Sequence, residues 1–188
     1  MNAVKNCYPE LPEMPYKQEA IAEADVVAHI HTLPFNTEAK RTTFTVSFNE
    51  TGGFKALVNN NAAGLQGDNA RWRHSWDGVI KATTVKNENM TGNARRFLVF
   101  DRWQSSIDML AFYMNSRGIY VGGNAKDFAN INPVGPARQD QVTGKPLATD
   151  LYTAYYRGWV IGDIKAAPRK PDIADFTLLY LKSQTIFV

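Results

Sequence analysis

A β-hairpin pattern in the middle of the chain limits the folds available to it. Residues 79–86 and 95–100 are rich in β-branched and aromatic side chains, as strands are. Between them, residues 87–93 contain three Asn and one Gly, which favour a turn. Apolar residues at helical spacing precede this hairpin and return after it. We therefore expect an α+β protein, mainly α, with a small β-hairpin lobe.

Apolar residues recur at intervals of three and four in three segments, which predicts a helix in each. These segments are 17–31, 101–116 and 147–160. A fourth segment, 37–51, is ambiguous because its centre alternates small polar and large apolar side chains as a strand does. An N-cap at Asn36 or Thr37, and the pair Gly52-Gly53 after the segment, favour a helix. Residues 54–71, rich in Asn and Gly, are expected to form a loop too polar for the core.

The chain shows no internal repeat and no low-complexity linker. We expect one domain over residues 17–163, preceded by an extended lead (1–16) and followed by a tail (164–188) that packs on the domain or on a partner. With 188 residues the chain can bury a core without disulfides, and its single cysteine, Cys7, cannot form an internal bridge.

Charge and motif content exclude several classes of function. The formal charge of +3 is spread along the chain, so a nucleic-acid partner is not expected. The three histidines lack metal-ligand spacing, and no phosphate-binding or dinucleotide-binding glycine motif is present, so we expect no metal and no cofactor. No apolar run reaches the roughly 18 residues of a membrane span, and the N-terminus has no secretion-leader pattern.

Glu50 is the residue with the best prospect of chemistry. It lies at the expected end of a helix beside Phe48, and a loop of neutral amides follows it. A carboxylic acid against an apolar wall is the arrangement by which glycosidases protonate a leaving-group oxygen. Amide side chains and the nearby Trp72 and Trp76 suit the polar edges and flat faces of sugars. The alternative is a surface glutamate at a helix end, followed by ordinary turn residues.

The order of three motifs resembles the lysozyme superfamily. Glu50-Thr51-Gly52 followed by Gly64-Leu65-Gln66 is similar to the Glu-Ser/Thr-Gly and Gly-Leu-Gln motifs of that superfamily. Residues 97–101 (FLVFD) and 117–120 (RGIY) are similar to bacterial N-acetylglucosaminidases, and 154–158 (AYYRG) to lytic transglycosylases. The resemblance covers residues 37–159.

This resemblance implies a lysozyme-like helical domain with a small β-lobe, acting on peptidoglycan or a related β-1,4-linked aminosugar polymer. Glu50 would be the general acid. The catalytic candidates are Glu50, Asp68 and Tyr120, and the candidates for substrate binding are Asn60, Asn61, Gln66, Trp72, Tyr155 and Tyr156. The site of action would be the cell wall or periplasm, reached by a phage, a holin, a dedicated secretion route or after removal of a leader.

The sequence departs from the glucosaminidase pattern on the first hairpin strand. Where such enzymes often carry a second acidic residue, the chain has Val85. Asp68 and Asp101 could replace that carboxylate, although Asp101 also suits the N-cap of the next helix. A single-acid mechanism, as in lytic transglycosylases, is open as well. So is a non-catalytic saccharide-binding or scaffold protein of the same fold, and the oligomeric state is left open.

Overall fold

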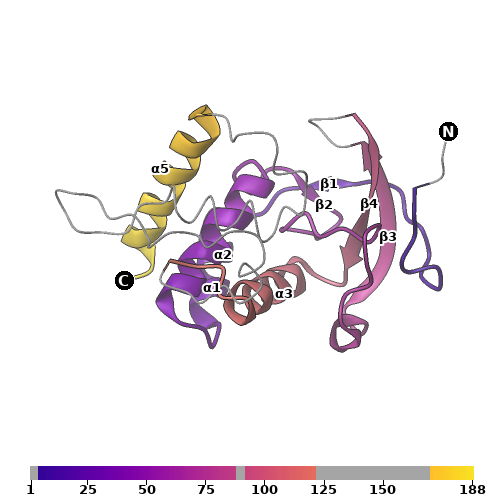
Figure 1. The fold of residues 1–188 in the computed structure, drawn as a ribbon, viewed down its shortest axis with the longest axis horizontal. Coiled ribbons are helices and arrows are strands. Elements are labelled where there is room, and N and C mark those ends of the chain that lie inside the picture. Colours follow the sequence, from indigo (N-terminus) through magenta and orange to yellow (C-terminus); the bar gives the residue numbers. More distant parts are fainter. Residues whose placement is uncertain (1–3, 88–91, 122–169) are drawn as a thin grey trace, which may run out of the picture. The chain divides into compact units, whose positions relative to one another are not determined.

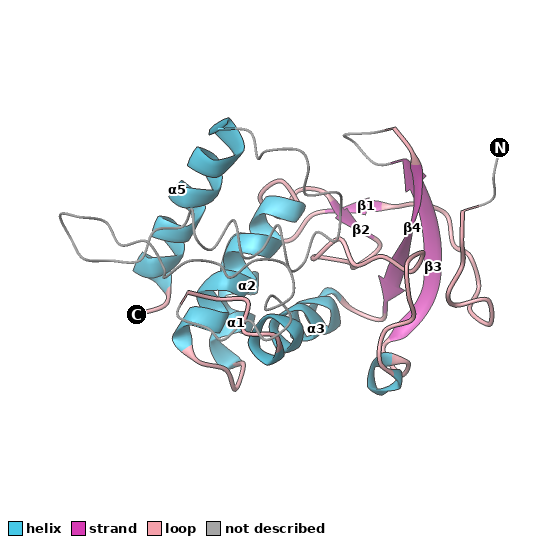
Figure 2. Cartoon of the chain, viewed as in Figure 1, coloured by secondary structure: helices cyan, strands magenta, loops and turns pink. Residues whose placement is uncertain are grey.

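The computed structural model describes residues 4–87, 92–121 and 170–188 (Figure 1). Within these ranges it contains four α-helices, one short 3-10 helix and two antiparallel sheets of two strands each, a mixed α+β fold that is mainly α (Figure 2). The α-helices are α1 (Glu23–Thr32), α2 (Thr37–Glu50), α3 (Trp103–Ser116) and α5 (Lys170–Ile186). No helix in the described part of the chain is long and apolar enough to cross a membrane.

Residue contacts group the chain into two compact units that are not continuous in sequence. The first unit contains Met1–Val26 and Glu50–Met109, and the second contains Val27–Asn49 and Leu110–Val188. The lead expected from the sequence groups with the first unit, and α5, in the expected tail, groups with the second.

The hairpin of the first unit forms where the sequence predicted it. Strand β3 (Ile80–Asn87) pairs with β4 (Ala94–Phe100) in antiparallel register, with Thr83 opposite Leu98. The last five residues of β4 are all buried, since this strand packs inside the unit rather than at its surface. Aromatic and β-branched side chains suit such a position.

The N-terminal lead is packed against this hairpin. Thr83 donates its amide to the carbonyl of Pro12 (2.9 Å), its carbonyl accepts from the amide of Met14 (2.8 Å), and the Tyr8 side chain is fully buried. The lead therefore belongs to the unit's core: it contains a turn in which the Leu11 amide donates to the Tyr8 carbonyl (3.1 Å), and Glu13 forms a parallel bridge with Thr83 of the sheet. Buried aromatic area of this kind is a major stabilising term.

The first helix starts later than predicted. Residues 17–31 were expected to be helical, yet α1 begins at Glu23, and Gln18–Glu19 form strand β1, which pairs with β2 (Leu57–Val58). The Asn59 side chain accepts from the amide of Lys17 (2.7 Å), and the Asn59 amide donates to the Lys17 carbonyl (3.0 Å). These hydrogen bonds hold the segment extended, which helical periodicity alone does not reveal.

The ambiguous segment is a helix, as predicted. Asn36 caps α2, because its Oδ1 accepts from the amide of Ala39 (2.8 Å). The strand-like hydroxyl residues at its centre bond back to the preceding turn: Thr43 donates to the Ala39 carbonyl (2.7 Å) and Ser47 to the Thr43 carbonyl (2.7 Å). Such bonds satisfy hydroxyl groups inside a buried helix and so make this sequence compatible with one.

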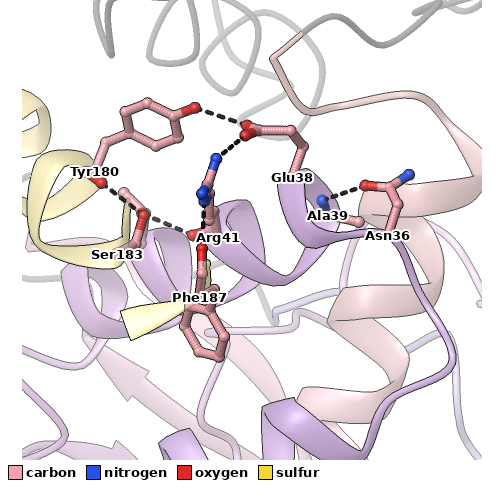
Figure 3. A network of polar contacts seen from close by, with 8 residues as sticks. Asn36, Glu38, Ala39, Arg41, Tyr180, Ser183 and Phe187 are labelled. Atoms are coloured by element: carbon pink, nitrogen blue, oxygen red, sulfur yellow. Dashed lines mark hydrogen bonds and ion pairs between the residues drawn. The ribbon is translucent and has the colours of Figure 1, made fainter. Parts of the chain in front are cut away.

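In the second unit, the tail docks on α2 (Figure 3). The Tyr180 hydroxyl donates to Glu38 Oε2 (2.6 Å), and Arg41 Nε donates to the carbonyl of Phe187 (2.8 Å). The Phe187 ring lies 5.9 Å from that of Phe44, between centroids. The tail therefore has an intramolecular partner in α2. The helix expected over 147–160 lies outside the described residues.

Candidate functional site

Glu50 is the last residue of α2 and its side chain is exposed to solvent. The helix stops directly after it because Gly52 and Gly53 adopt positive φ angles of 55° and 76°, which favour glycine. The buried Thr51 fastens the turn, since its hydroxyl accepts from the amide of Phe54 (3.0 Å) and its carbonyl accepts from the amide of Ala56 (3.0 Å). The backbone that carries Glu50 is thus fixed, and the residue is exposed to solvent.

The loop of residues 61–68 approaches the Glu50 carboxylate at Gly64. A β-carbon placed on Gly64 would lie 3.2 Å from Oε2 of Glu50, and the φ angle of Gly64 is +62°. Glycine is favoured here by both the conformation and the close approach. The two motifs that resemble those of lysozymes therefore lie close together, although thirteen residues separate Glu50 from Gly64 in the sequence.

This loop is part of the core, contrary to the expectation for residues 54–71. Leu57, Ala62 and Leu65 are buried, and so is Asn61, at 1% exposure. The Asn61 amide nitrogen donates to the carbonyls of Leu65 (2.8 Å) and Leu98 (3.0 Å), and its oxygen accepts from the amide of Leu65 (3.0 Å). A polar loop can be buried when its side chains satisfy its own backbone in this way.

The side chains of Asn61 and Asn60 consequently stabilise the loop through hydrogen bonds to the protein itself. Asn61 has no exposed group to offer a ligand, since its carboxamide is buried and bonded to backbone on both sides. Asn60 adopts a φ of 65°, its amide donates to Glu19 Oε2 (2.7 Å), and its side chain donates to the Phe100 carbonyl (3.3 Å). Asn is among the few non-glycine residues that tolerate this conformation.

Asp68 is held in an ion pair on the same loop. Its Oδ2 lies 2.7 Å from Nε of Arg95 and 3.2 Å from the amide of Arg96, and only 8% of the residue is exposed. Burial raises the pKa of Asp68, but the hydrogen bonds from Arg95 and from the Arg96 amide outweigh it, so that the net pKa is lowered. Asp68 is therefore suited to be a fixed negative charge and unsuited to donate a proton.

Gln66 and Trp72 lie beside this ion pair. The Gln66 side-chain oxygen accepts from Arg95, and its carbonyl accepts from the indole nitrogen of Trp72 (2.8 Å). The Trp72 amide in turn donates to the hydroxyl of Tyr8 (2.9 Å). Trp72 is half-buried, so part of its ring is available to a ligand while its position is fixed by backbone contacts.

The remaining candidates belong to the other compact unit or lie outside the described residues. Tyr120 follows α3 and belongs to the second compact unit, whereas Glu50, Gln66 and Asp68 belong to the first. Tyr155 and Tyr156 lie outside the described residues.

The structure also places Asp101, a candidate for the second carboxylate, and Val85, which stands where glucosaminidases often carry that acid. Asp101 lies just before α3, and its Oδ1 accepts from the Arg102 amide (2.8 Å) and from the Ser105 hydroxyl (2.7 Å), which holds its carboxylate at the start of that helix. Val85 lies opposite Arg96 in the hairpin, so that this register carries no acid on either strand. The described residues also contain no group of three or more His, Cys, Asp or Glu that could hold a metal ion.

Comparison of the chain with models of known families, with curated proteins and with solved structures gives no match. Any assignment of function therefore depends on the residues themselves.

Arg95 and Tyr8 are the site residues that sequence reasoning missed. Arg95 contacts two of the predicted site residues, and Tyr8 supports Trp72. The sequence held a weak signal for Arg95, because a charged residue in a strand that packs inward needs a partner of opposite charge, and Asp68 is such a residue. No comparable signal marked Tyr8, whose side chain meets Gly67 and Trp72, far away along the chain.

Proposed function

We propose that this protein cleaves the β-1,4-linked aminosugar strand of peptidoglycan with Glu50 as general acid, in a lysozyme-like domain. The observation that carries the proposal is the close approach of Gly64 to the Glu50 carboxylate, which leaves no room for a side chain at Gly64. It joins the end of α2 to the Gly-Leu-Gln loop in the order expected for lysozyme-like enzymes. Glu50 is exposed to solvent, so that a leaving-group oxygen of a bound polymer can approach it.

The positions considered for a second carboxylate favour a single-acid mechanism. Asp68 forms an ion pair with Arg95, and the strand position that often carries a second acid in glucosaminidases holds Val85. Glu50 would then donate its proton to the leaving oxygen and, as a carboxylate, accept the proton of the attacking group. That group would be a hydroxyl of the sugar, as in lytic transglycosylases, and the product would be an anhydro-sugar.

Substitution of Glu50 by Gln tests this proposal. The amide keeps the size of the side chain but cannot supply the proton, so we expect the release of soluble fragments from purified cell walls to fall by about 100-fold or more. Mass spectrometry of the fragments of the unaltered protein would distinguish anhydro-sugars from reducing ends. Asp25→Asn is the control, since Asp25 is an exposed acid of the same unit and its loss changes the charge equally. Unchanged cleavage by Glu50→Gln would overturn the assignment.

A non-catalytic saccharide-binding protein is the second candidate. The observation in its favour is that both positions considered for a second carboxylate are engaged elsewhere, Asp68 with Arg95 and Asp101 with the start of α3. This candidate predicts that the protein sediments with cell walls, releases no fragments, and sediments equally well after Glu50→Gln.

A further inference from the structure

Arg95 joins the two polar residues that follow Gly64 in the loop. Its guanidinium nitrogen Nε donates to Asp68 Oδ2 (2.7 Å), its terminal nitrogen donates to Asp68 Oδ1 (3.2 Å), and the same terminal nitrogen donates to Gln66 Oε1. The paired carboxylate holds the plane of the guanidinium in a two-point contact. Arg95 therefore presents a third N–H donor to Gln66 in a fixed direction.

The backbone keeps the two partners in register. The Leu65 carbonyl accepts from the amide of Leu98 (2.9 Å), and the Gly67 amide donates to the carbonyl of Arg96 (2.9 Å). Gln66 itself bridges to Phe97 in antiparallel fashion. The loop thus runs beside β4 like a short third strand. This backbone pairing fixes the positions from which Arg95 and Gln66 extend toward each other.

The chemistry of arginine decides which way the Gln66 carboxamide faces. A guanidinium has only donors, so the group that meets it must be the oxygen of the amide. The NH2 group consequently faces away from Arg95. It has no hydrogen-bond acceptor among the residues that the structure describes, and Gln66 is only half-buried.

We propose that Arg95 is a positioning residue that fixes the Gln66 carboxamide so that its N–H group binds a neutral oxygen of the saccharide, a hydroxyl or an acetamido carbonyl. This inference rests on the proposed function and specifies one contact of the same site. Gln66 is two residues from Gly64, so their α-carbons are about 7 Å apart at most, and the contact falls within a few sugar units of Glu50.

Asp68 neutralises the charge of Arg95 in this arrangement. Without Asp68, the positive charge of Arg95 would be available to acidic groups of a ligand, such as the carboxylates of peptide stems. With it the charge is neutralised within the protein, and the site offers a polar, uncharged donor. The contact therefore selects for the sugar rather than for its anionic substituents.

Substitution of Gln66 by Glu separates the two roles of this side chain. The carboxylate retains an oxygen for Arg95 but replaces the N–H donor with a second oxygen, which repels the acceptor of the ligand. We expect an unchanged or higher Tm, a KM for cell-wall fragments at least tenfold higher and a kcat changed less than threefold. Gln104→Glu introduces the same charge in the same unit and is expected to leave KM within twofold.

The Arg95→Lys variant tests the positioning role without relying on activity. Lysine keeps the charge beside Asp68 but has no rigid second donor for Gln66. We expect the side-chain NH2 resonances of Gln66 in an NMR spectrum to be distinct and ordered in the unaltered protein and to become averaged in Arg95→Lys. A rise in KM should accompany this change.

The outcomes separate this inference from the proposed function. If Glu50→Gln cleaves normally, the proposed function fails, and the NMR experiment still decides whether Arg95 orders Gln66. If cleavage depends on Glu50 but Gln66→Glu retains the normal KM, the saccharide contact is overturned. Gln66 resonances that are unaffected by Arg95→Lys would overturn the positioning role.

Discussion

Backbone conformation explains why particular residues occupy the loop beside Glu50. Asn59, Asn60 and Gly64 all have positive φ angles, of 48°, 65° and 62°. The run of asparagines suggested donors and acceptors for a sugar, and the residue types are indeed those of a polar site. Their hydrogen bonds, however, are largely made to the backbone of the first unit. The role of these amides in the fold could not be predicted from the sequence, because the backbone groups that they meet lie far away along the chain.

Gly64→Ala should impair activity more than stability. The new β-carbon would lie 3.2 Å from Oε2 of Glu50, which can yield because it is the end of a flexible side chain. The positive φ angle should cost about 1 kcal/mol of unfolding free energy. Displacement of the carboxylate from its position should lower cleavage at least tenfold, because catalysis is sensitive to small misplacements.

Gly92→Ala is the matched control for this substitution. Gly92 has a φ angle of +70°, but a β-carbon there would meet no atom within 4 Å. The two variants should therefore lose similar stability in urea unfolding, and only Gly64→Ala should lose activity. Equal activity in both would show that the contact with Gly64 does not set the position of Glu50.

Among the secondary-structure elements, α2 shows how tertiary contacts stabilise a helix whose sequence only weakly favours one. Its capping residue and its glycine stop could be read from the sequence, whereas its central hydroxyl residues favour strand. The helix gains its buried surroundings from partners such as α5, whose docking position no local pattern revealed. Long-range packing of this kind commonly outweighs propensity.

Tyr180→Phe should weaken the contact between α5 and α2. It removes the hydrogen bond to Glu38 from a fully buried residue, which should cost about 1–3 kcal/mol of unfolding free energy near pH 7. Tyr16→Phe, which alters an exposed phenol, should cost much less.

The difference in unfolding free energy between the unaltered protein and Tyr180→Phe should also depend on pH. Burial, and then the hydrogen bond and charge of Glu38, raise the pKa of Tyr180 above the ordinary value of about 10. The stabilisation is therefore fully present below about pH 10. It declines at higher pH, where the unfolded chain releases the proton and the folded chain retains it. Urea unfolding between pH 8 and pH 11 measures this, and a constant difference would contradict it.

For the complete chain, the notable feature is that both compact units are assembled from separate sequence segments. Their boundaries fall within α1 and α3 and at the last residue of α2, so that three helices contribute residues to both. Unfolding of one unit would therefore disrupt helices on which the other depends. Such grouping could not be predicted from the sequence, because local patterns carry no information on pairing between distant segments.

We expect the chain to unfold in a single transition. Three of the four tryptophans, at positions 72, 76 and 103, lie in the first unit, so fluorescence reports mainly on that unit. Tyr180→Phe alters the second unit, yet it should shift the fluorescence transition and the circular dichroism transition by the same amount. A shift seen by circular dichroism alone would show that the units unfold separately.

The amino-acid sequence alone determined the elements that depend on local rules: the hairpin, the capped and glycine-stopped helix α2, and the α+β class. It also drew attention to Glu50 and to the Gly-Leu-Gln loop. Only the tertiary structure brought Gly64 to the Glu50 carboxylate, paired Asp68 with Arg95 and docked α5 on α2. Turns, caps and periodicity are set by neighbouring residues, whereas these contacts join residues separated by 14 to 142 positions and depend on how the whole backbone packs.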